Sequence, residues 1–121
     1  MINKTKILYV DDEEMNTLLF QIIFSEKYDV ILASNGDNGL KILDKEPEIA
    51  VVISDMKMPG LSGVDFIKKA YNLFPEKRYF ILSGMDITSE IQNLLKKKIL
   101  ISFLKKPIDL QKVEKLIEKH K

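Results

Sequence analysis

The sequence predicts an α/β domain in which five short parallel strands alternate with five amphipathic helices. Short apolar runs rich in Val, Ile and Leu are typical of strands buried in a parallel sheet. Between these runs lie longer stretches with apolar residues at helical spacing. The chain has 121 residues, which is enough for one core and one domain, residues 1–121. Because parallel strands need crossover connections, helices are expected on both faces of the sheet.

The five strand candidates are short, and polar or turn-forming residues follow each of them. They lie at residues 6–10, 30–33, 50–54, 79–83 and 101–104. The third reads Ala-Val-Val-Ile-Ser and is followed by Asp55, after which Pro59 and Gly60 force the chain into a loop. A carboxylate directly behind a buried strand is expected to be held rigidly at the edge of the sheet.

The first helix candidate spans residues 14–25. Its apolar residues recur at helical spacing, which predicts that they face the sheet. They are Met15, Leu18, Leu19, Ile22 and Ile23.

The other four helix candidates span residues 37–44, 63–74, 87–97 and 110–119. Their predicted inward residues are, in chain order, Leu40 and Leu43, then Val64, Ile67 and Tyr71, then Ile91, Leu94 and Leu95, then Val113, Leu116 and Ile117. Side-chain oxygens before three of these helices are expected to cap them. The candidates are Ser34 or Asn35, Asp86 or Thr88, and Asp109.

Composition excludes several classes of protein. Lys plus Arg number 19 and Asp plus Glu 18, so the net charge of +1 favours neither nucleic acid nor anionic membranes as a partner. The absence of cysteine excludes a disulfide scaffold and a thiolate metal site. No apolar run approaches the ~20 residues of a membrane span, and residues 1–6 lack the apolar core of a signal peptide. We therefore expect a soluble, cytoplasmic domain without membrane contact or direct nucleic-acid contact.

The carboxyl ends of all strands lie at one edge of a parallel sheet, and here they carry a distinctive set of side chains. This edge receives Asp11 and Asp12, Asp55, Ser83, and Lys105 with Lys106. Clustered carboxylates repel one another unless a hard cation lies among them, and Mg²⁺ binds carboxylates together with phosphate. An aspartate can also act as a nucleophile and form an aspartyl phosphate, whose oxygens need cationic and hydroxyl partners. The set predicts a phospho-aspartate site with Mg²⁺ as its cofactor.

Four segments, each at the end of a strand, carry a family resemblance. They are Val10-Asp11-Asp12-Glu13, the motif Asp-x-x-Met-Pro-x-x-x-Gly from Asp55 to Gly63, Ile81-Leu82-Ser83-Gly84, and Leu104-Lys105-Lys106-Pro107. Together they resemble the response-regulator receiver domains, the family of the chemotaxis response regulator, over essentially the whole chain. The resemblance implies a doubly wound (βα)5 sandwich of three layers, the flavodoxin-like fold, and a role in two-component signal transduction.

The resemblance also implies the parts of a phosphorylation site. Asp55 accepts a phosphoryl group from a histidine kinase or a phosphotransfer protein. Asp12, Asp55 and the backbone carbonyl of Lys57 bind Mg²⁺ directly, and Asp11 contacts the ion through water. Lys106, whose bond to the following proline is commonly cis in this family, pairs with the acyl phosphate. Such a domain is not an enzyme in the ordinary sense, since it catalyses only its own phosphorylation and dephosphorylation.

A switch is implied by the same resemblance. Ser83 hydrogen-bonds a phosphoryl oxygen, and Phe103 turns inward as Ser83 moves, which alters the surface of the fourth helix, fifth strand and fifth helix. A downstream protein or a covalently linked output domain is expected to read this surface, and a phosphorylation-dependent homodimer is the alternative. Residues 98–102 lack the Gly-Ala pair and the acidic residues of many members. We hypothesise that Ile99, Leu100 and Ile101 form part of a partner or dimer surface instead.

Three other interpretations share this architecture. A flavodoxin-type cofactor binder needs a Ser-, Thr- or Gly-rich phosphate loop after the first strand, where four acidic residues, 11–14, stand. A Mg²⁺-dependent phosphohydrolase needs a general acid two residues after Asp55, where Lys57 stands. A degenerate receiver that only binds a partner does not require the intact set of site residues. Whether the chain is a stand-alone regulator or the receiver part of a longer protein stays open.

Overall fold

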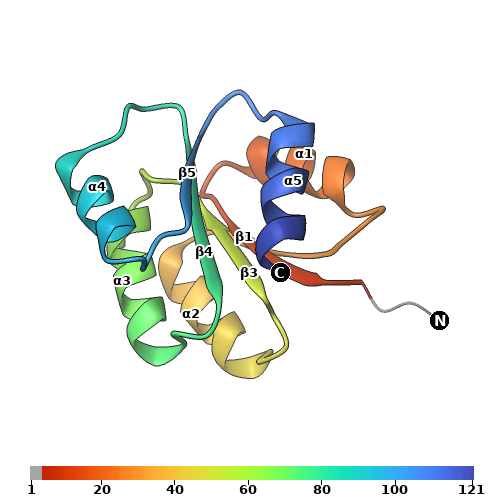
Figure 1. The fold of residues 1–121 in the computed structure, drawn as a ribbon. Helices are drawn as coiled ribbons and strands as arrows, with labels where there is room; N and C mark the ends of the chain where they lie inside the picture. The colour runs from red at the N-terminus through yellow and green to blue at the C-terminus, as the bar shows by residue number, and fades with distance from the viewer. Residues whose placement is uncertain (1–3) are drawn as a thin grey trace.

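The computed structural model describes residues 4–121, so the first three residues of the predicted domain and of the N-terminal segment lie outside the described residues. Five strands alternate with five helices in the predicted order (Figure 1). They are β1 (Lys6–Val10), α1 (Glu14–Phe24), β2 (Asp29–Ala33), α2 (Gly36–Lys45), β3 (Val51–Ser54), α3 (Gly63–Leu73), β4 (Arg78–Ser83), α4 (Ser89–Lys96), β5 (Ser102–Lys105) and α5 (Leu110–His120). The predicted element bounds differ from these by at most two residues.

All five strands pair in parallel in the order β2-β1-β3-β4-β5. The helices α1 and α5 cover one face of the sheet, and α2, α3 and α4 cover the other (Figure 1). This is the predicted doubly wound, flavodoxin-like fold. The strand order reverses beside β1, because the chain steps outward to β2 and then crosses to β3 on the other side. Open α/β sheets bind ligands at the carboxyl ends of the strands at such a reversal.

The sheet separates two hydrophobic cores because successive strand residues point to opposite faces. Leu8 and Val10 of β1 pack on the side of α2, α3 and α4. Ile7 and Tyr9 pack on the side of α1 and α5. Residues 7–10 of β1 and 51–53 of β3 are therefore buried on both faces of the sheet. This explains why the apolar runs in the sequence are unbroken.

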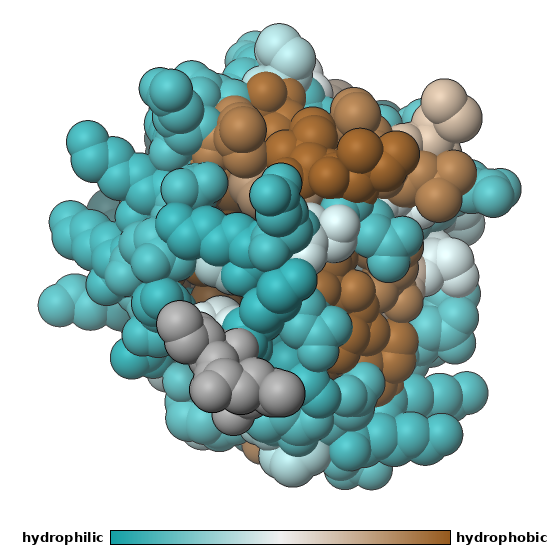
Figure 2. All heavy atoms as spheres, turned by 90° about the vertical axis from the view of Figure 1, so that its right-hand side faces the viewer, coloured by the Kyte–Doolittle hydropathy of each residue, from teal (hydrophilic) through white to brown (hydrophobic). Residues whose placement is uncertain are grey.

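The predicted inward face of α1 is wrong. Met15 and Ile22 are 77% and 75% exposed, and Leu18 and Leu19 are also exposed, while Ile23 is half-buried. The helix instead buries Thr17, Phe20 and Phe24. Figure 2 shows apolar atoms gathered on this side of the molecule. The two phenylalanines bury more apolar surface than the aliphatic residues would, and only one side of the helix can face the sheet.

The remaining helices follow the prediction. Asn35, Thr88 and Asp109 each accept a hydrogen bond from the backbone N–H three residues on, and so cap α2, α4 and α5. Ser62 caps α3 in the same way. These bonds satisfy N–H groups that have no partner inside the helix.

The structure contradicts the hypothesis of an apolar partner surface for Leu100, whereas for Ile99 and Ile101 it stays a prediction. Leu100 is 1% exposed, and the two isoleucines are half-buried against the two cores. The reason lies at the end of α4, where Lys98 adopts a left-handed backbone with φ 61°. This conformation turns the chain back, so that the N–H groups of residues 99 and 100 bond to the carbonyl of Leu94.

In residues 4–121 no helix has the length and apolar character that a membrane crossing requires.

Candidate functional site

The acidic residues of the site are held by the backbone of the two central strands. The N–H of Asp55 donates to the carbonyl of Val10 at 2.8 Å, directly after β3. The N–H of Asp11 donates to the carbonyl of Ala33 at 3.1 Å, directly after β1. Both carboxylates therefore leave the sheet at neighbouring strand ends, where the strand order reverses.

Gly63 explains why the motif that begins at Asp55 ends in glycine. A Cβ atom at this position would lie 2.0 Å from the carbonyl oxygen of Asp55, which no side chain tolerates. The Gly63 N–H donates to the carbonyl of Met56 at 2.8 Å, so α3 starts against the backbone that carries Asp55. Between them Gly60 takes the left-handed conformation, φ +77°, that closes the loop.

Three carboxylates and one ammonium converge at this edge. Oxygens of Asp11, Asp12 and Asp55 lie within 4.8 Å of one another. Asp11 is 1% and Asp55 9% exposed, whereas Asp12 faces solvent. The Nζ of Lys106 lies 3.2 Å from Oδ1 of Asp55 and 3.4 Å from Oδ2 of Asp11. With three carboxylates against one ammonium, the site keeps an excess of negative charge.

Burial and neighbouring charges shift the pKa values of Asp55 and Lys106. Burial raises the pKa of Asp55, and the negative charge of Asp11 adds to this, although the Lys106 ammonium opposes both. Burial by itself would lower the pKa of Lys106, but the carboxylates of Asp11 and Asp55 outweigh it and raise that pKa. Lys106 therefore remains a cation beside the carboxylates.

Asp11 has partners that the sequence analysis did not identify. Its Oδ2 accepts hydrogen bonds from the Tyr9 hydroxyl at 2.7 Å and from the Asn16 amide at 3.1 Å, and its Oδ1 accepts from the Glu13 N–H at 3.0 Å. Burial, followed by the hydrogen bond to Asp11, raises the pKa of the Tyr9 hydroxyl well above its usual value. The available signal was the spacing of Tyr9 and Asp11, because residues two apart on a strand point to the same side.

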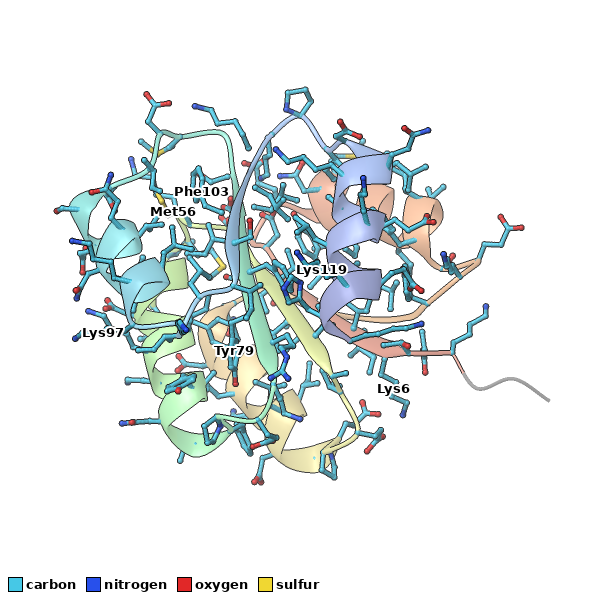
Figure 3. All side chains as sticks on the ribbon, in the orientation of Figure 1. Lys6, Met56, Tyr79, Lys97, Phe103 and Lys119 are labelled. Carbon is cyan, nitrogen blue, oxygen red and sulfur yellow. The ribbon has the colours of Figure 1, made fainter. Side chains whose placement is uncertain are left out.

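The other predicted site residues lie on or shortly after strands β3, β4 and β5. Ser83 ends β4, is 2% exposed, and its Oγ accepts the N–H of Met85 at 3.0 Å. The Lys106 N–H donates to the Ser83 carbonyl at 2.7 Å, and the Lys106–Pro107 bond is cis, as expected. Lys57 is exposed in the loop after β3. Phe103 of β5 is half-buried on the side of the sheet that α4 covers, where Figure 3 also shows Met56.

The donor set fits a hard divalent cation. All three side chains offer carboxylate oxygens, which Mg²⁺ prefers over nitrogen or sulfur. Their oxygens lie close enough together for one ion to contact them directly or through its waters. The residues at this edge therefore meet the requirements of a magnesium site.

Comparison with known families agrees with this geometry. The model of the response regulator receiver domain matches residues 7–118 of the chain. The chain belongs to the response regulator receiver domain family.

Curated relatives and solved structures support the assignment. Sporulation initiation phosphotransferase F of Bacillus subtilis is 31% identical over 122 residues, which cover 99% of this chain and 95% of that protein. The hydrogenase regulatory protein HoxA of Cupriavidus necator is 31% identical over 85 residues, which cover 70% of this chain and 17% of that protein. The chain thus spans nearly all of one relative and less than a fifth of another.

Two solved structures give the likeness of the fold. A response regulator receiver domain protein from Clostridium thermocellum superposes with a TM-score of 0.85 at 31% identity, over 96% of this chain and 93% of that one. The response regulator TrrA of Thermotoga maritima, solved in complex with Mg²⁺–BeF, gives a TM-score of 0.81 at 23% identity, over 97% and 99% of the two chains.

Membership in this family decides against two of the three alternative interpretations of the sequence. A receiver domain is a signalling module of two-component systems rather than a true enzyme. The acidic pocket of Asp11, Asp12 and Asp55 is the pocket that such a domain uses for the phospho-aspartate and its metal ion. This favours the receiver over the flavodoxin-type cofactor binder and the phosphohydrolase.

Proposed function

We propose that Asp55 is the phospho-acceptor of this receiver domain, residues 1–121. The observation that carries the proposal is the position of Lys106, whose Nζ contacts the carboxylates of both Asp55 and Asp11 in a pocket with a third carboxylate nearby. A cation beside a buried carboxylate can neutralise the negative charge that a phosphoryl group brings with it. The exposed side of the pocket, at Asp12, leaves access for a phosphodonor.

The proposed reaction is a phosphoryl transfer to a carboxylate oxygen. An Oδ atom of Asp55 forms a bond to phosphorus while the bond to the donor breaks, and the donor's nitrogen or oxygen keeps the electron pair. The product is an acyl phosphate on Asp55. Hydrolysis of that acyl phosphate returns Asp55 and releases inorganic phosphate.

Asp11, Asp12, Asp55 and the backbone carbonyl of Lys57 would hold Mg²⁺ in this reaction. When bound, the ion supplies positive charge to the phosphoryl oxygens. The excess of negative charge in the pocket favours its binding, and the buried Asp11 gives it a rigid anchor. Lys106, which contacts Asp55, would pair with the acyl phosphate.

Ser83 and Phe103 form the proposed switch. The Ser83 hydroxyl accepts one hydrogen bond from Met85 and still has its own proton to donate to a phosphoryl oxygen. A Cβ at the next residue, Gly84, would meet nothing within 4 Å, so the loop has room to move. Movement of this loop toward Asp55 would favour a more buried Phe103 and change the surface of α4, β5 and α5.

The proposed partners follow from this chemistry. The donor is a histidine kinase or a phosphotransfer protein, and a downstream protein or a linked output domain reads the changed surface. A phosphorylation-dependent homodimer is the alternative readout. The proposed place of action is the cytoplasm.

Intact mass after incubation with Mg²⁺ and acetyl phosphate tests the proposed acceptor. We expect a labile gain of one phosphoryl group in the wild type, none without Mg²⁺, and none in Asp55→Asn. Asp44→Asn, which changes an exposed aspartate on α2, is the matched control and should be phosphorylated normally. Phosphorylation that persists in Asp55→Asn would refute the assignment.

Two neighbouring lysines give a second, internally controlled test. Lys106 contacts Asp55, whereas Lys105 points away and pairs with the exposed Asp86 of the β4–α4 loop. Lys106→Met should slow phosphorylation strongly, by the ~10²–10³-fold typical of losing one stabilising group at a reaction centre. Lys105→Met should leave the rate close to that of the wild type.

A further inference from the structure

Tyr9 carries a hydroxyl group on its aromatic ring, within the apolar stretch 7–10 of β1. It is 0% exposed, and its neighbours in β1 are Ile7, Leu8 and Val10. A buried hydroxyl needs a hydrogen-bond partner, because burial removes it from water. Its partner is Asp11, at 2.7 Å, so the hydroxyl points along the sheet into the acidic pocket.

The two carboxylate oxygens of Asp11 accept different numbers of hydrogen bonds. Oδ2 receives three donors, from Tyr9 at 2.7 Å, Asn16 at 3.1 Å and Lys106 at 3.4 Å. Within residues 4–121, Oδ1 receives one donor, the Glu13 N–H at 3.0 Å. The carboxylate is thereby oriented, with Oδ2 occupied by the protein and Oδ1 retaining a free lone pair for a cation or its water.

The Tyr9 donor is the best fixed of those on Oδ2. Its ring stacks on Phe20 of α1 with centroids 4.2 Å apart and planes 5° from parallel. Phe20 is itself 0% exposed and packs against Phe24 at 4.5 Å. Asn16 and Lys106 are only partly buried, and the lysine has a long flexible chain that is shared with Asp55.

We propose that Tyr9 is a positioning residue of the acidic pocket, whose hydroxyl fixes the Asp11 carboxylate in the orientation in which it shares a divalent cation with Asp12 and Asp55. The inference rests on the proposed Mg²⁺-dependent phosphorylation. Hydrogen-bond partners of metal ligands orient those ligands, and their loss typically weakens metal binding 10–100-fold. Tyr9 does not touch the cation or the phosphoryl group and acts only through Asp11.

Amide NMR titrations with Mg²⁺ at constant ionic strength test the proposal on three proteins: wild type, Tyr9→Phe and Tyr28→Phe. Tyr28 is the matched control. It is likewise a buried tyrosine whose hydroxyl donates to a carboxylate, that of Glu118 at 2.6 Å, but it lies at the opposite edge of the sheet. We expect the dissociation constant for Mg²⁺ to rise about 10-fold in Tyr9→Phe and to stay at the wild-type value in Tyr28→Phe. A Tyr9→Phe protein that binds Mg²⁺ as tightly as Tyr28→Phe overturns the inference.

A kinetic readout separates positioning from general damage. In Tyr9→Phe, phosphorylation by acetyl phosphate should need about 10-fold more Mg²⁺ for half-maximal rate but approach the wild-type rate at saturating Mg²⁺. A structural defect would instead lower the maximal rate at unchanged Mg²⁺ dependence, which would count against the inference. Phe20→Leu keeps the Tyr9 hydroxyl but removes the ring that stacks on Tyr9. It should also weaken Mg²⁺ binding, by a smaller factor than Tyr9→Phe.

The wild-type titration distinguishes a failure of the role of Tyr9 from a failure of the proposed function. If the wild type binds Mg²⁺ and is phosphorylated while Tyr9→Phe behaves identically, only the role of Tyr9 fails. If the wild type itself binds no Mg²⁺, the proposed function fails and the inference with it.

Discussion

The helices α1 and α5 lie on the same face of the sheet, but only α5 buries the residues that its sequence pattern predicts. In α5, Val113 and Ile117 are 2% and 1% exposed. In α1, Met15 and Ile22 of the predicted inward face are the most exposed of the large apolar side chains among the described residues. The difference lies in the number of candidate faces, because α5 has a single apolar stripe with charged residues around it, whereas α1 is apolar on two sides.

The surface of the sheet against which α1 packs decides which of its two apolar sides is buried. Tyr9 of β1 presents a flat aromatic ring toward this helix, and Phe20 stacks on it. Phe24 and Tyr28 continue the aromatic row at 4.5 and 6.4 Å. Helical periodicity identifies apolar faces, but it carries no information about the shape of the surface that a face will meet.

The largest expected effect is on the aromatic face of α1. Phe20→Ala should lower the free energy of unfolding by about 3–5 kcal/mol, since it removes a fully buried ring and leaves a cavity beside Tyr9. Denaturant unfolding with linear extrapolation measures it. A loss below about 1 kcal/mol, the average for point mutants, would mean that the aromatic row does not anchor α1.

The corresponding substitution in α5 should have a similar but smaller effect. Ile117→Ala is expected to cost about 2–5 kcal/mol, because Ile117 is 1% exposed in the same core. Leu110→Ala, at the 43% exposed first position of the same helix, is the control and should cost far less. Equal losses in the two variants would contradict the assigned inward face.

A hydrogen bond between the segment that follows α1 and helix α5 makes the stability of the fold depend on pH. The hydroxyl of Tyr28, which follows α1, donates to Glu118 of α5 and lowers the pKa of that carboxyl below its ordinary 4.5. Because the folded pKa is the lower one, the stabilisation is present above pH 4.5 and is lost as the pH falls through the folded value.

Tyr28→Phe should therefore cost about 0.5–1.5 kcal/mol at neutral pH, the usual net value of one hydrogen bond. The difference between wild type and variant should shrink as the pH is lowered below 4.5. Thermal unfolding at a series of pH values measures it, and a difference that stays constant to pH 3 would exclude Glu118 as the titrating group.

The smallest expected effect is on the exposed face of α1. Ile22→Gln replaces a side chain that is 75% exposed, so the stability should change by no more than about 0.5 kcal/mol. Phe24→Gln on the opposite face of the helix is the contrasting variant and should destabilise strongly, because it buries an amide without a partner. A large loss in Ile22→Gln would show that the aliphatic face packs against something in solution.

Much of the candidate site was predictable from local order along the chain. Asp11, Asp12, Asp55, Ser83 and Lys106 each stand at the end of an apolar run, and a parallel sheet brings such ends to one edge. The sequence also showed that the motif ends in Gly63. It did not show why a glycine is needed there, which is that a Cβ would lie 2.0 Å from the carbonyl oxygen of Asp55. The contact of Tyr9 with Asp11 was signalled only by their two-residue spacing, because a tyrosine in a strand ordinarily serves as core.

The sequence by itself determined the elements and their order, the single apolar stripe of α5, the caps and the residues at the carboxyl edge. These follow from spacing, turn chemistry and strand direction, which act over a few residues. Tertiary structure alone decided which side of α1 is buried, that Leu100 enters the core, and that Lys106 lies between Asp11 and Asp55. Each of these depends on contacts between segments that are distant in the chain. The free energy of folding there depends on how well side chains fit together and how charges are paired, and local periodicity carries no information about either.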